Sequence, residues 1–367
     1  MRIQISVVIG TRNRDDNLKY CLASLNKQNY PKNLYEVIVV DYGGLTETGA
    51  LVSKFKNDNF IYVRVNESGL FNESRSKNIG IRKSRGEIVI CTNADIIFSK
   101  IVLSNTIKEF TDRRKDGLFT LRRRELPENF TIENMFNKLI SKTYEPSSNQ
   151  IGIGPESAIG DFQAATRKSW LAVKGYDERM IGWGAMDLDL SLRMKEIGNA
   201  MIWLDHRHIK IYHQFHDWRR DRPALLHNIN IMLMQTGIKY GPDQDKWGQL
   251  HKNKTVYIGY DTNFLTDIYQ SIKKQVDLYI SIKKGYKLSI KEKNQLINIS
   301  GNYDLLLIKK MISIRFLGLL IMRFRITIAT IMNQRLYSLI YANNLSYSRV
   351  EKFAIKYGLS VYNNYQN

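Results

Sequence analysis

Short hydrophobic runs alternate with segments of helical spacing through the first quarter of the chain. A run without polar alternation is typical of a strand that is buried on both faces of a parallel sheet. Such runs predict strands at residues 3–9, 35–40, 60–65 and 87–91. The segments between them predict helices at residues 15–28, 46–55 and 72–84. Strands and helices in this order form right-handed βαβ units, so we expect an α/β fold with a mostly parallel sheet and helices on both faces.

The pattern changes twice further along the chain. Residues 122–160 are irregular and predict loops around one helix near residues 132–142. Shorter helices and strands are expected at residues 170–173, 187–197, 200–204 and 209–212. Beyond about residue 260 the chain becomes rich in Lys, Ile and Leu with helical spacing, and it carries no recognisable motif. We therefore expect a first domain at residues 1–260 and a basic, mainly helical region at residues 261–367.

The chain carries 55 Lys and Arg against 35 Asp and Glu, which gives a formal net charge of +20. A surplus of this size favours an anionic partner: nucleic acid, an acidic membrane surface, or an acidic or phosphate-bearing polymer. No nucleic-acid-binding motif is found, so no nucleic acid partner is expected. The N-terminus does not resemble a signal peptide, and no window is apolar enough to span a membrane. We expect a cytoplasmic protein with peripheral contact to the anionic inner face of a membrane.

Asp95 follows the strand predicted at residues 87–91, and ligands of parallel sheets bind at this end of the strands. A carboxylate there can reach a divalent cation that bridges the two phosphates of a nucleotide, although Asp is also common in ordinary turns. His213 and His216 follow another predicted strand, where an imidazole could complete the metal site or belong to the surface. We expect Mn²⁺ or Mg²⁺ as the cation.

A second group of acidic residues stands at the start of the helix predicted at residues 187–197. The helix macrodipole stabilises an anion there, so Asp187 or Asp189 could be a general base. The alternative is that Asp187 caps the helix. Trp183 has a glycine on each side, which lets the backbone turn sharply and present the indole to a sugar ring.

Two basic residues, Arg75 and Lys77, lie in the helix predicted at residues 72–84. Their charges could neutralise a diphosphate, or they could be ordinary solvated charges of a helix. Asp41 ends the second predicted strand and is expected at the same edge of the sheet as Asp95.

Five segments, taken in order, resemble the GT-A glycosyltransferases of family 2. Residues 7–14 look like their opening strand and donor loop, and residues 36–41 look like the second strand, whose last Asp contacts the nucleotide base. Residues 77–89 resemble the helix and strand that lead to the Asp-x-Asp metal motif. Residues 160–163 and 182–190 resemble the acceptor-side motif shared with galactosyltransferases and chondroitin-polymerase-like enzymes.

The residue types and the resemblance together imply a role for each candidate. Asp187 is expected to be the general base, and Asp95 with His213 is expected to hold the metal. The donor nucleotide is expected to contact Thr11, Arg12, Asp41, Arg75, Lys77 and Asn93. The acceptor or its sugar is expected to contact Asp161, Gln163, Trp183, Gly184 and Asp189. Two positions depart from the family pattern: Asn93 replaces the first Asp of Asp-x-Asp, and Met186 replaces the usual Glu before the base.

The resemblance implies transfer of a sugar from a nucleotide-sugar to a hydroxyl of a glycan or lipid-linked acceptor, with inversion. The expected donor is a UDP-sugar, and the expected process is the synthesis of a cell-surface polysaccharide such as a capsule. The basic composition favours an acidic acceptor. The alternative is a non-catalytic basic protein that binds an anionic polymer or a membrane surface. Residues 261–367 are expected to contact the acceptor, a membrane surface or another copy of the chain.

Overall fold

The computed structural model describes most of the first 216 residues and a few short segments beyond them. The described residues are 2–44, 46–55, 59–66, 68–69, 71–113, 117–142, 144, 160–180, 184–204, 209–216, 230, 246–249 and 256–257. Every element below belongs to one compact unit. Trp183 and the region expected at residues 261–367 lie outside the described residues.

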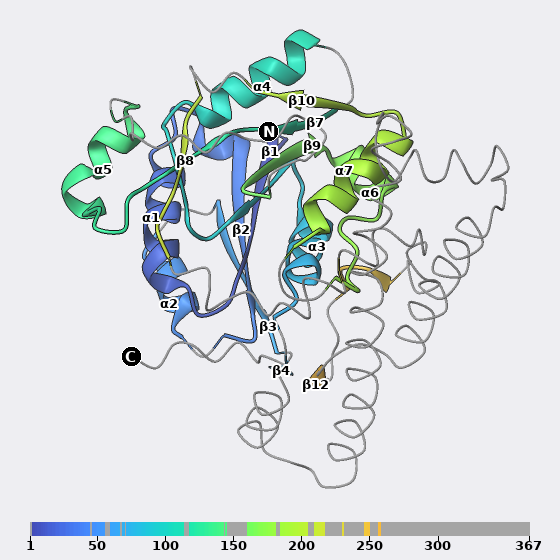
Figure 1. Cartoon of the computed structure of the whole chain (residues 1–367), viewed down its shortest axis with the longest axis horizontal. Coiled ribbons are helices and arrows are strands. Elements are labelled where there is room, and N and C mark those ends of the chain that lie inside the picture. The colour runs from blue at the N-terminus through green and yellow to red at the C-terminus, as the bar shows by residue number, and fades with distance from the viewer. Residues whose placement is uncertain are drawn as a thin grey trace, which may run out of the picture. The chain divides into compact units, whose positions relative to one another are not determined.

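A seven-stranded sheet forms the centre of this unit (Figure 1). Its strands, in spatial order, are β10 (Ala200–Trp203), β7 (Gly117–Thr120), β9 (Phe162–Thr166), β5 (Ile88–Asn93), β1 (Ile5–Thr11), β2 (Tyr35–Tyr42) and β3 (Phe60–Val65). All neighbouring pairs are parallel except those of β9, which runs antiparallel to both β5 and β7. The α/β class and the mostly parallel sheet expected from the sequence are therefore confirmed.

Helices cover both faces of the sheet (Figure 1). The helices of the described residues are α1 (Asp15–Asn26), α2 (Thr48–Ser53), α3 (Glu73–Lys83), α4 (Val102–Arg113), α5 (Ile132–Ile140), α6 (Arg167–Ala172) and α7 (Met186–Glu196), with the 3₁₀ helix η1 (Lys32–Leu34). α3 packs against β1 and β2. A Cβ atom on Gly80 of α3 would lie 2.3 Å from Val8 Cγ1, so this close approach requires glycine.

A second, three-stranded sheet lies beside the first and carries part of the candidate site. It consists of β6 (Ile96–Phe98), β11 (Ile211–His213) and β8 (Arg123–Glu125), with β11 in the middle. Apolar residues of α5 and of this sheet share a small hydrophobic core. The remaining two strands, β4 (Ser68–Gly69) and β12 (Val256–Tyr257), pair with each other.

The expectation of loops at residues 122–160 is wrong at β8, and α4, β7 and β9 were not predicted from the sequence. β8 is short and contains only charged residues, so its order comes from pairing with β11 and not from a hydrophobic pattern. β9 is buried at its first four positions by β5 and β7, which are distant in the sequence.

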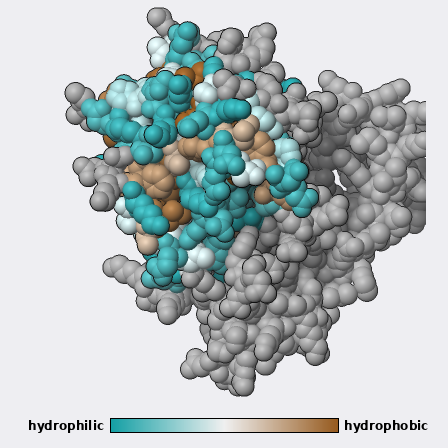
Figure 2. All heavy atoms as spheres, turned by 90° about the vertical axis from the view of Figure 1, so that its left-hand side faces the viewer, coloured by the Kyte–Doolittle hydropathy of each residue, from teal (hydrophilic) through white to brown (hydrophobic). Residues whose placement is uncertain are grey.

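One face of the described residues is mostly polar (Figure 2). Figure 2 shows the face that lies on the left of Figure 1, where hydrophilic residues surround smaller hydrophobic areas. Within the described part of the chain, no helix combines the length and the hydrophobicity that crossing a bilayer requires.

Candidate active site

The carboxyl ends of β1, β2 and β5 bring several predicted residues to one edge of the main sheet. Thr11 of β1 is in register with Asp41 of β2. Gly10, next to Thr11, is in register with Asn93 at the end of β5. Thr11 Oγ1 is buried and has no hydrogen-bond partner among the described residues. A buried hydroxyl without a partner is costly, which marks this edge as a place where a ligand could supply the missing bond.

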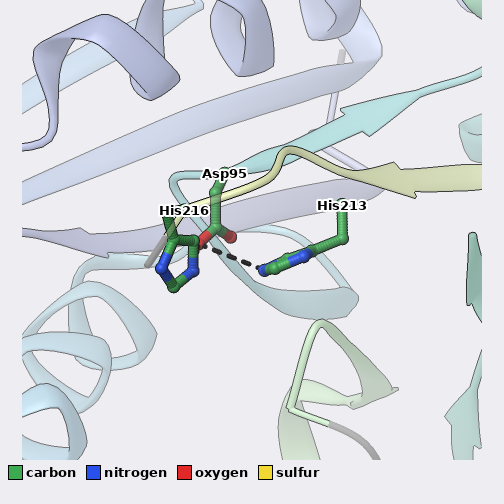
Figure 3. A group of neighbouring side chains, drawn as sticks. All are labelled: Asp95, His213 and His216. Carbon is green, nitrogen blue, oxygen red and sulfur yellow. Dashed lines mark ion pairs between the residues drawn. The ribbon is translucent and has the colours of Figure 1, made fainter. Parts of the chain in front are cut away.

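Asp95, His213 and His216 form the most compact group of possible metal ligands in the described part of the chain (Figure 3). Asp95 lies in the tight turn between β5 and β6, and His213 ends β11, which pairs with β6. Asp95 Oδ2 lies 3.0 Å from His216 Nε2 and 3.5 Å from His213 Nε2. The backbone N–H of Gln214 donates to the Asp95 carbonyl at 2.9 Å, which holds the two segments together.

The electrostatics of this cluster favour the charged forms of Asp95 and His213. Burial would raise the pKa of Asp95, but the two imidazoles outweigh it and hold the pKa well below its usual range. Burial would lower the pKa of His213, but the Asp95 carboxylate raises it to about 10. Asp95 Oδ1 is buried and accepts no hydrogen bond from any residue that the structure describes. One open carboxylate oxygen beside two imidazoles fits a divalent cation such as Mn²⁺, whereas Mg²⁺ prefers oxygen ligands alone.

Glu125 orients the imidazole of His213. β8 and β11 are parallel, with Glu125 directly in register with His213. His213 Nδ1 and Glu125 Oε2 are hydrogen-bonded at 2.7 Å. The Nδ1 proton then belongs to this bond. Nε2 faces Asp95 and can bind a metal when the cation displaces its proton. Glu125 was not predicted as a site residue from the sequence. The only sequence feature that pointed to it was its position two residues after Arg123 in a run of charged residues.

Asn93, at the position of the first Asp of the Asp-x-Asp motif, joins two charged residues. Lys77 is fully buried, and its Nζ donates to Asn93 Oδ1 at 2.8 Å and pairs with Glu73 Oε1 at 2.6 Å. Asn93 Nδ2 in turn donates to Asp161 Oδ1 at 3.0 Å. A carboxylate at position 93 would have no proton to donate and would face the negative Asp161. The hydrogen bonds to Lys77 and Asp161 thus explain why asparagine occupies position 93.

Arg75 and Lys77 have different surroundings although both lie on α3. The Arg75 guanidinium donates to Glu178 Oε2 at 2.8 Å and to the Gln249 carbonyl at 2.7 Å. Burial would lower the pKa of Lys77, but Glu73 and then Asp187 outweigh it and raise the pKa. Lys77 therefore belongs to the group around Asn93, while Arg75 holds residues 246–249 against α3. A contact of Arg75 with a diphosphate stays a prediction.

Asp187 lies in the first turn of α7, behind a left-handed bend. Gly184 and Ala185 have φ angles of +101° and +64°, and Ala185 occupies the N-cap position. The alternative in which Asp187 caps the helix is therefore wrong. Its Oδ1 is buried without a hydrogen-bond donor among the described residues, and a Cβ atom on Gly160 would lie 2.4 Å from Oδ2. Burial raises the pKa of Asp187 to about 7, against the opposing charge of Lys77. Such a carboxylate is suited to proton transfer near neutral pH.

The other acceptor-side candidates have partners within the chain. Gln163 accepts a hydrogen bond from the Tyr176 hydroxyl at 2.6 Å, and its Nε2 lies 3.5 Å from the Asp187 carbonyl. Asp189 pairs with Arg193 one turn later, at 2.8 Å. Gln163 therefore supports the backbone of Asp187, and Asp189 is occupied within its own helix.

Asp41 is a fully buried carboxylate with three donors. It accepts hydrogen bonds from the Tyr62 hydroxyl at 2.8 Å and the Gly44 N–H at 3.0 Å, and it pairs with Arg64. Arg12, from the same edge, is also buried. Both residues stand where the donor nucleotide was expected, and the contact itself stays a prediction.

Two family models match this part of the chain. Residues 6–172 match glycosyl transferase family 2, and residues 151–217 match the N-terminal domain of galactosyltransferase. Residues 6–172, just under half of the chain, are thus similar to the family 2 glycosyltransferases. The two models overlap at residues 151–172 and together include every site residue discussed above except Gln249.

Curated proteins that are similar to parts of the chain come from bacteria and archaea. The poly(ribitol-phosphate) β-N-acetylglucosaminyltransferase TarS of Staphylococcus aureus is 27% identical over 116 residues, which are 32% of this chain and 20% of TarS. The glycosyltransferase sll0501 of Synechocystis is 30% identical over 187 residues, which are 49% of this chain and 55% of that protein. The chain thus spans about a fifth to a half of the length of these relatives.

A solved structure shows the same fold. The crystal structure of S. aureus TarS residues 1–349 in complex with UDP aligns with a TM-score of 0.50 at 15% identity. The alignment covers 94% of this chain and 93% of the TarS fragment. At this identity the similarity supports the GT-A fold alone.

Among the residues that it describes, the structure brings most predicted site residues together. Asp95 and His213 meet as predicted, and His216, which was weighed only as an alternative ligand, joins them. Asn93 and Asp161 are bonded to each other. Glu125 was missed because its role depends on the register of β8 against β11, which a single sequence does not reveal.

Proposed function

We propose that this protein is a metal-dependent glycosyltransferase that moves a sugar from a UDP-sugar to a hydroxyl of a glycan or lipid-linked acceptor. The observation that carries the proposal is the cluster of Asp95, His213 and His216, in a chain that matches glycosyl transferase family 2 at residues 6–172 and the N-terminal domain of galactosyltransferase at residues 151–217. The second match includes Asp187, whose Oδ1 is buried. The TarS fragment with the same fold is a complex with UDP, which supports a uridine nucleotide as the donor.

Asp187 would act as the general base. It would accept the proton of the acceptor hydroxyl while the hydroxyl oxygen attacks the anomeric carbon of the donor sugar. The bond between that carbon and the diphosphate oxygen breaks, so UDP leaves and the configuration at the anomeric carbon inverts. With its pKa near 7, Asp187 is partly ionised at neutral pH and can bind this proton.

Asp95, His213 and His216 would hold Mn²⁺ or Mg²⁺. The cation would supply charge stabilisation for the departing diphosphate. Their nitrogen-rich set favours Mn²⁺ over Mg²⁺. Residues of this chain then have two further tasks. The nucleotide would bind at Thr11, Arg12, Asp41, Arg75, Lys77 and Asn93, and the acceptor side would include Asp161, Gln163, Trp183 and Gly184.

An anionic acceptor is the second part of the proposal. The formal net charge of +20 favours a polymer that carries phosphate or carboxylate groups. The relative TarS is named for a poly(ribitol-phosphate) acceptor, which supports the same class. The process would be the synthesis of a cell-surface polysaccharide such as a capsule. We place the protein at the cytoplasmic face of the membrane, with residues 261–367 contacting the acceptor, the membrane surface or a second copy.

A hydrolysis screen tests the proposed function. The purified full chain is incubated with UDP-, GDP- and CMP-sugars in Mn²⁺ or in EDTA, and the released nucleotide is measured. We expect slow, Mn²⁺-dependent release of UDP from one UDP-sugar. No release from any donor, together with no thermal shift on adding UDP and Mn²⁺, would contradict the enzyme and favour a basic protein that binds an anionic polymer.

A further inference from the structure

Arg123 lies between the two halves of the candidate site. It begins β8, and side chains two residues apart on a strand point to the same face. Arg123 and Glu125 therefore share the face that meets His213, while Arg124 points to the other face. The side chain of Arg123 is only 17% exposed.

One side of the Arg123 guanidinium reaches the metal cluster. Its Nε donates to Glu125 Oε1 at 2.6 Å. The other oxygen of Glu125 is bonded to His213 Nδ1 at 2.7 Å. With both oxygens occupied, the Glu125 carboxylate cannot rotate without breaking one of the two bonds. The orientation of the His213 imidazole therefore depends on Arg123.

The other side of the guanidinium reaches the acceptor-side group. Arg123 Nη1 donates to Asp161 Oδ2 at 2.6 Å. Asp161 Oδ1 accepts from Asn93, and Asn93 accepts from Lys77. An unbroken series of hydrogen bonds and ion pairs thus runs from Lys77 through Arg123 to His213. Each carboxylate in the series uses both of its oxygens.

We propose that Arg123 is a positioning residue that fixes His213 for metal binding and holds it at a set distance from the Asp161 side of the site. This inference rests on the proposed function. A guanidinium is suited to the task because its donors form a rigid planar fork that can satisfy two carboxylates at once. A lysine ammonium is a point charge on a flexible stem and would hold neither carboxylate in a fixed plane.

The test measures Mn²⁺ binding to the full chain without donor or acceptor, by calorimetry and by the electron paramagnetic resonance of free Mn²⁺. R123Q should bind Mn²⁺ about 10- to 100-fold more weakly than wild type, the usual effect of removing the support of a metal ligand. R123K should fall between the two. R124Q is the matched control, because Arg124 is a buried arginine of the same strand on the opposite face. Its Mn²⁺ affinity should stay within about twofold of wild type.

A second variant shows whether Arg123 acts through Glu125. E125Q should weaken Mn²⁺ binding by itself, and R123Q/E125Q should bind no more weakly than E125Q, because the two changes break the same connection. Nitrogen NMR of labelled histidine gives a readout without metal, in which the Nδ1 resonance of His213 should shift in R123Q because Glu125 is no longer held by Arg123. R123K, which keeps the positive charge, keeps the proposal testable if R123Q folds poorly.

Each result has a defined meaning. Equal Mn²⁺ affinities of R123Q and wild type, or an equal loss in R124Q, would overturn the role of Arg123 and leave the proposed function intact. A wild-type chain that bound no Mn²⁺ would contradict the proposed metal site itself. Near-UV circular dichroism of each variant shows whether its fold is retained.

Discussion

Asp41 and Asp95 are two buried carboxylates at the same edge of the main sheet, yet their surroundings differ. Asp41 receives hydrogen bonds from Tyr62 and Gly44 and pairs with Arg64. Asp95 directs one oxygen at two imidazoles, while its other oxygen is buried without a described donor. The same contrast separates Asp161, which uses both oxygens, from Asp187, whose Oδ1 lacks a described donor.

The difference separates carboxylates that are fully hydrogen-bonded within the fold from carboxylates with one oxygen that a ligand could bind. Burying a charge is costly unless it is paired and hydrogen-bonded. Asp41 and Asp161 meet this condition through the chain itself, so they stabilise the fold and hold the site in place. Asp95 and Asp187 meet it only in part. A cation at Asp95 and an acceptor hydroxyl at Asp187 would supply what is missing.

The largest expected effect is the loss of the base. D187N should lower kcat of transfer by about a thousandfold, because removal of a general base typically costs two to four orders of magnitude. UDP affinity should change little. D189N is the matched control, since its carboxylate already pairs with Arg193, and we expect a loss below about tenfold. Full transfer by D187N would show that Asp187 is not the base.

The metal site gives the next largest effect. D95N should lower kcat/KM with Mn²⁺ by on the order of 100-fold, since charge stabilisation by a metal contributes several kcal/mol. The variant should also lose most of its Mn²⁺ affinity in a direct titration. Unchanged affinity in D95N would place the cation elsewhere.

The pH dependence of kcat tests the raised pKa of Asp187. A base must be ionised to accept a proton, and burial raises the pKa of Asp187 to about 7. With Mn²⁺ saturating, kcat should rise about tenfold per pH unit below pH 7 and level off above it. An acid limb centred near the ordinary aspartate pKa would contradict the assignment.

The smallest effect on catalysis is expected at Asp41. D41N should lower the free energy of unfolding by about 1–3 kcal/mol, because its buried donors lose a charged partner. E36Q is the matched control on the same strand: Glu36 is fully buried and bonded to Ser6 and Arg85 at the opposite end of β2. Both variants should lose stability in urea, and only D41N should weaken UDP binding. Equal UDP affinities in the two would show that Asp41 does not contact the nucleotide.

The sequence predicts the part of the fold whose elements are buried by their own composition. β1 and β2 are buried at every position, so their hydrophobic runs are unambiguous. β8 contains three charged residues and forms only because β11 lies beside it. Its register, and with it the roles of Arg123 and Glu125, depends on tertiary contacts that no local pattern contains.

The same distinction applies to the site. Asp95 and His213 could be proposed as partners because each ends a recognisable segment of a known motif. Asn93 could be seen as a departure from Asp-x-Asp, but its reason became clear only from its bonds to Lys77 and Asp161. The sequence likewise did not predict which carboxylates are fully hydrogen-bonded, because this depends on which donors the fold brings near them.

A crystal of the full chain grown with Mn²⁺ and UDP would test the central claim most directly, through anomalous scattering from manganese. We predict one strong anomalous peak for a manganese ion within bonding distance of Asp95, His213 Nε2 and His216, with the diphosphate of UDP as a further ligand. A peak bound to the phosphates without either histidine, or no peak at this edge of the sheet, would contradict the proposed site.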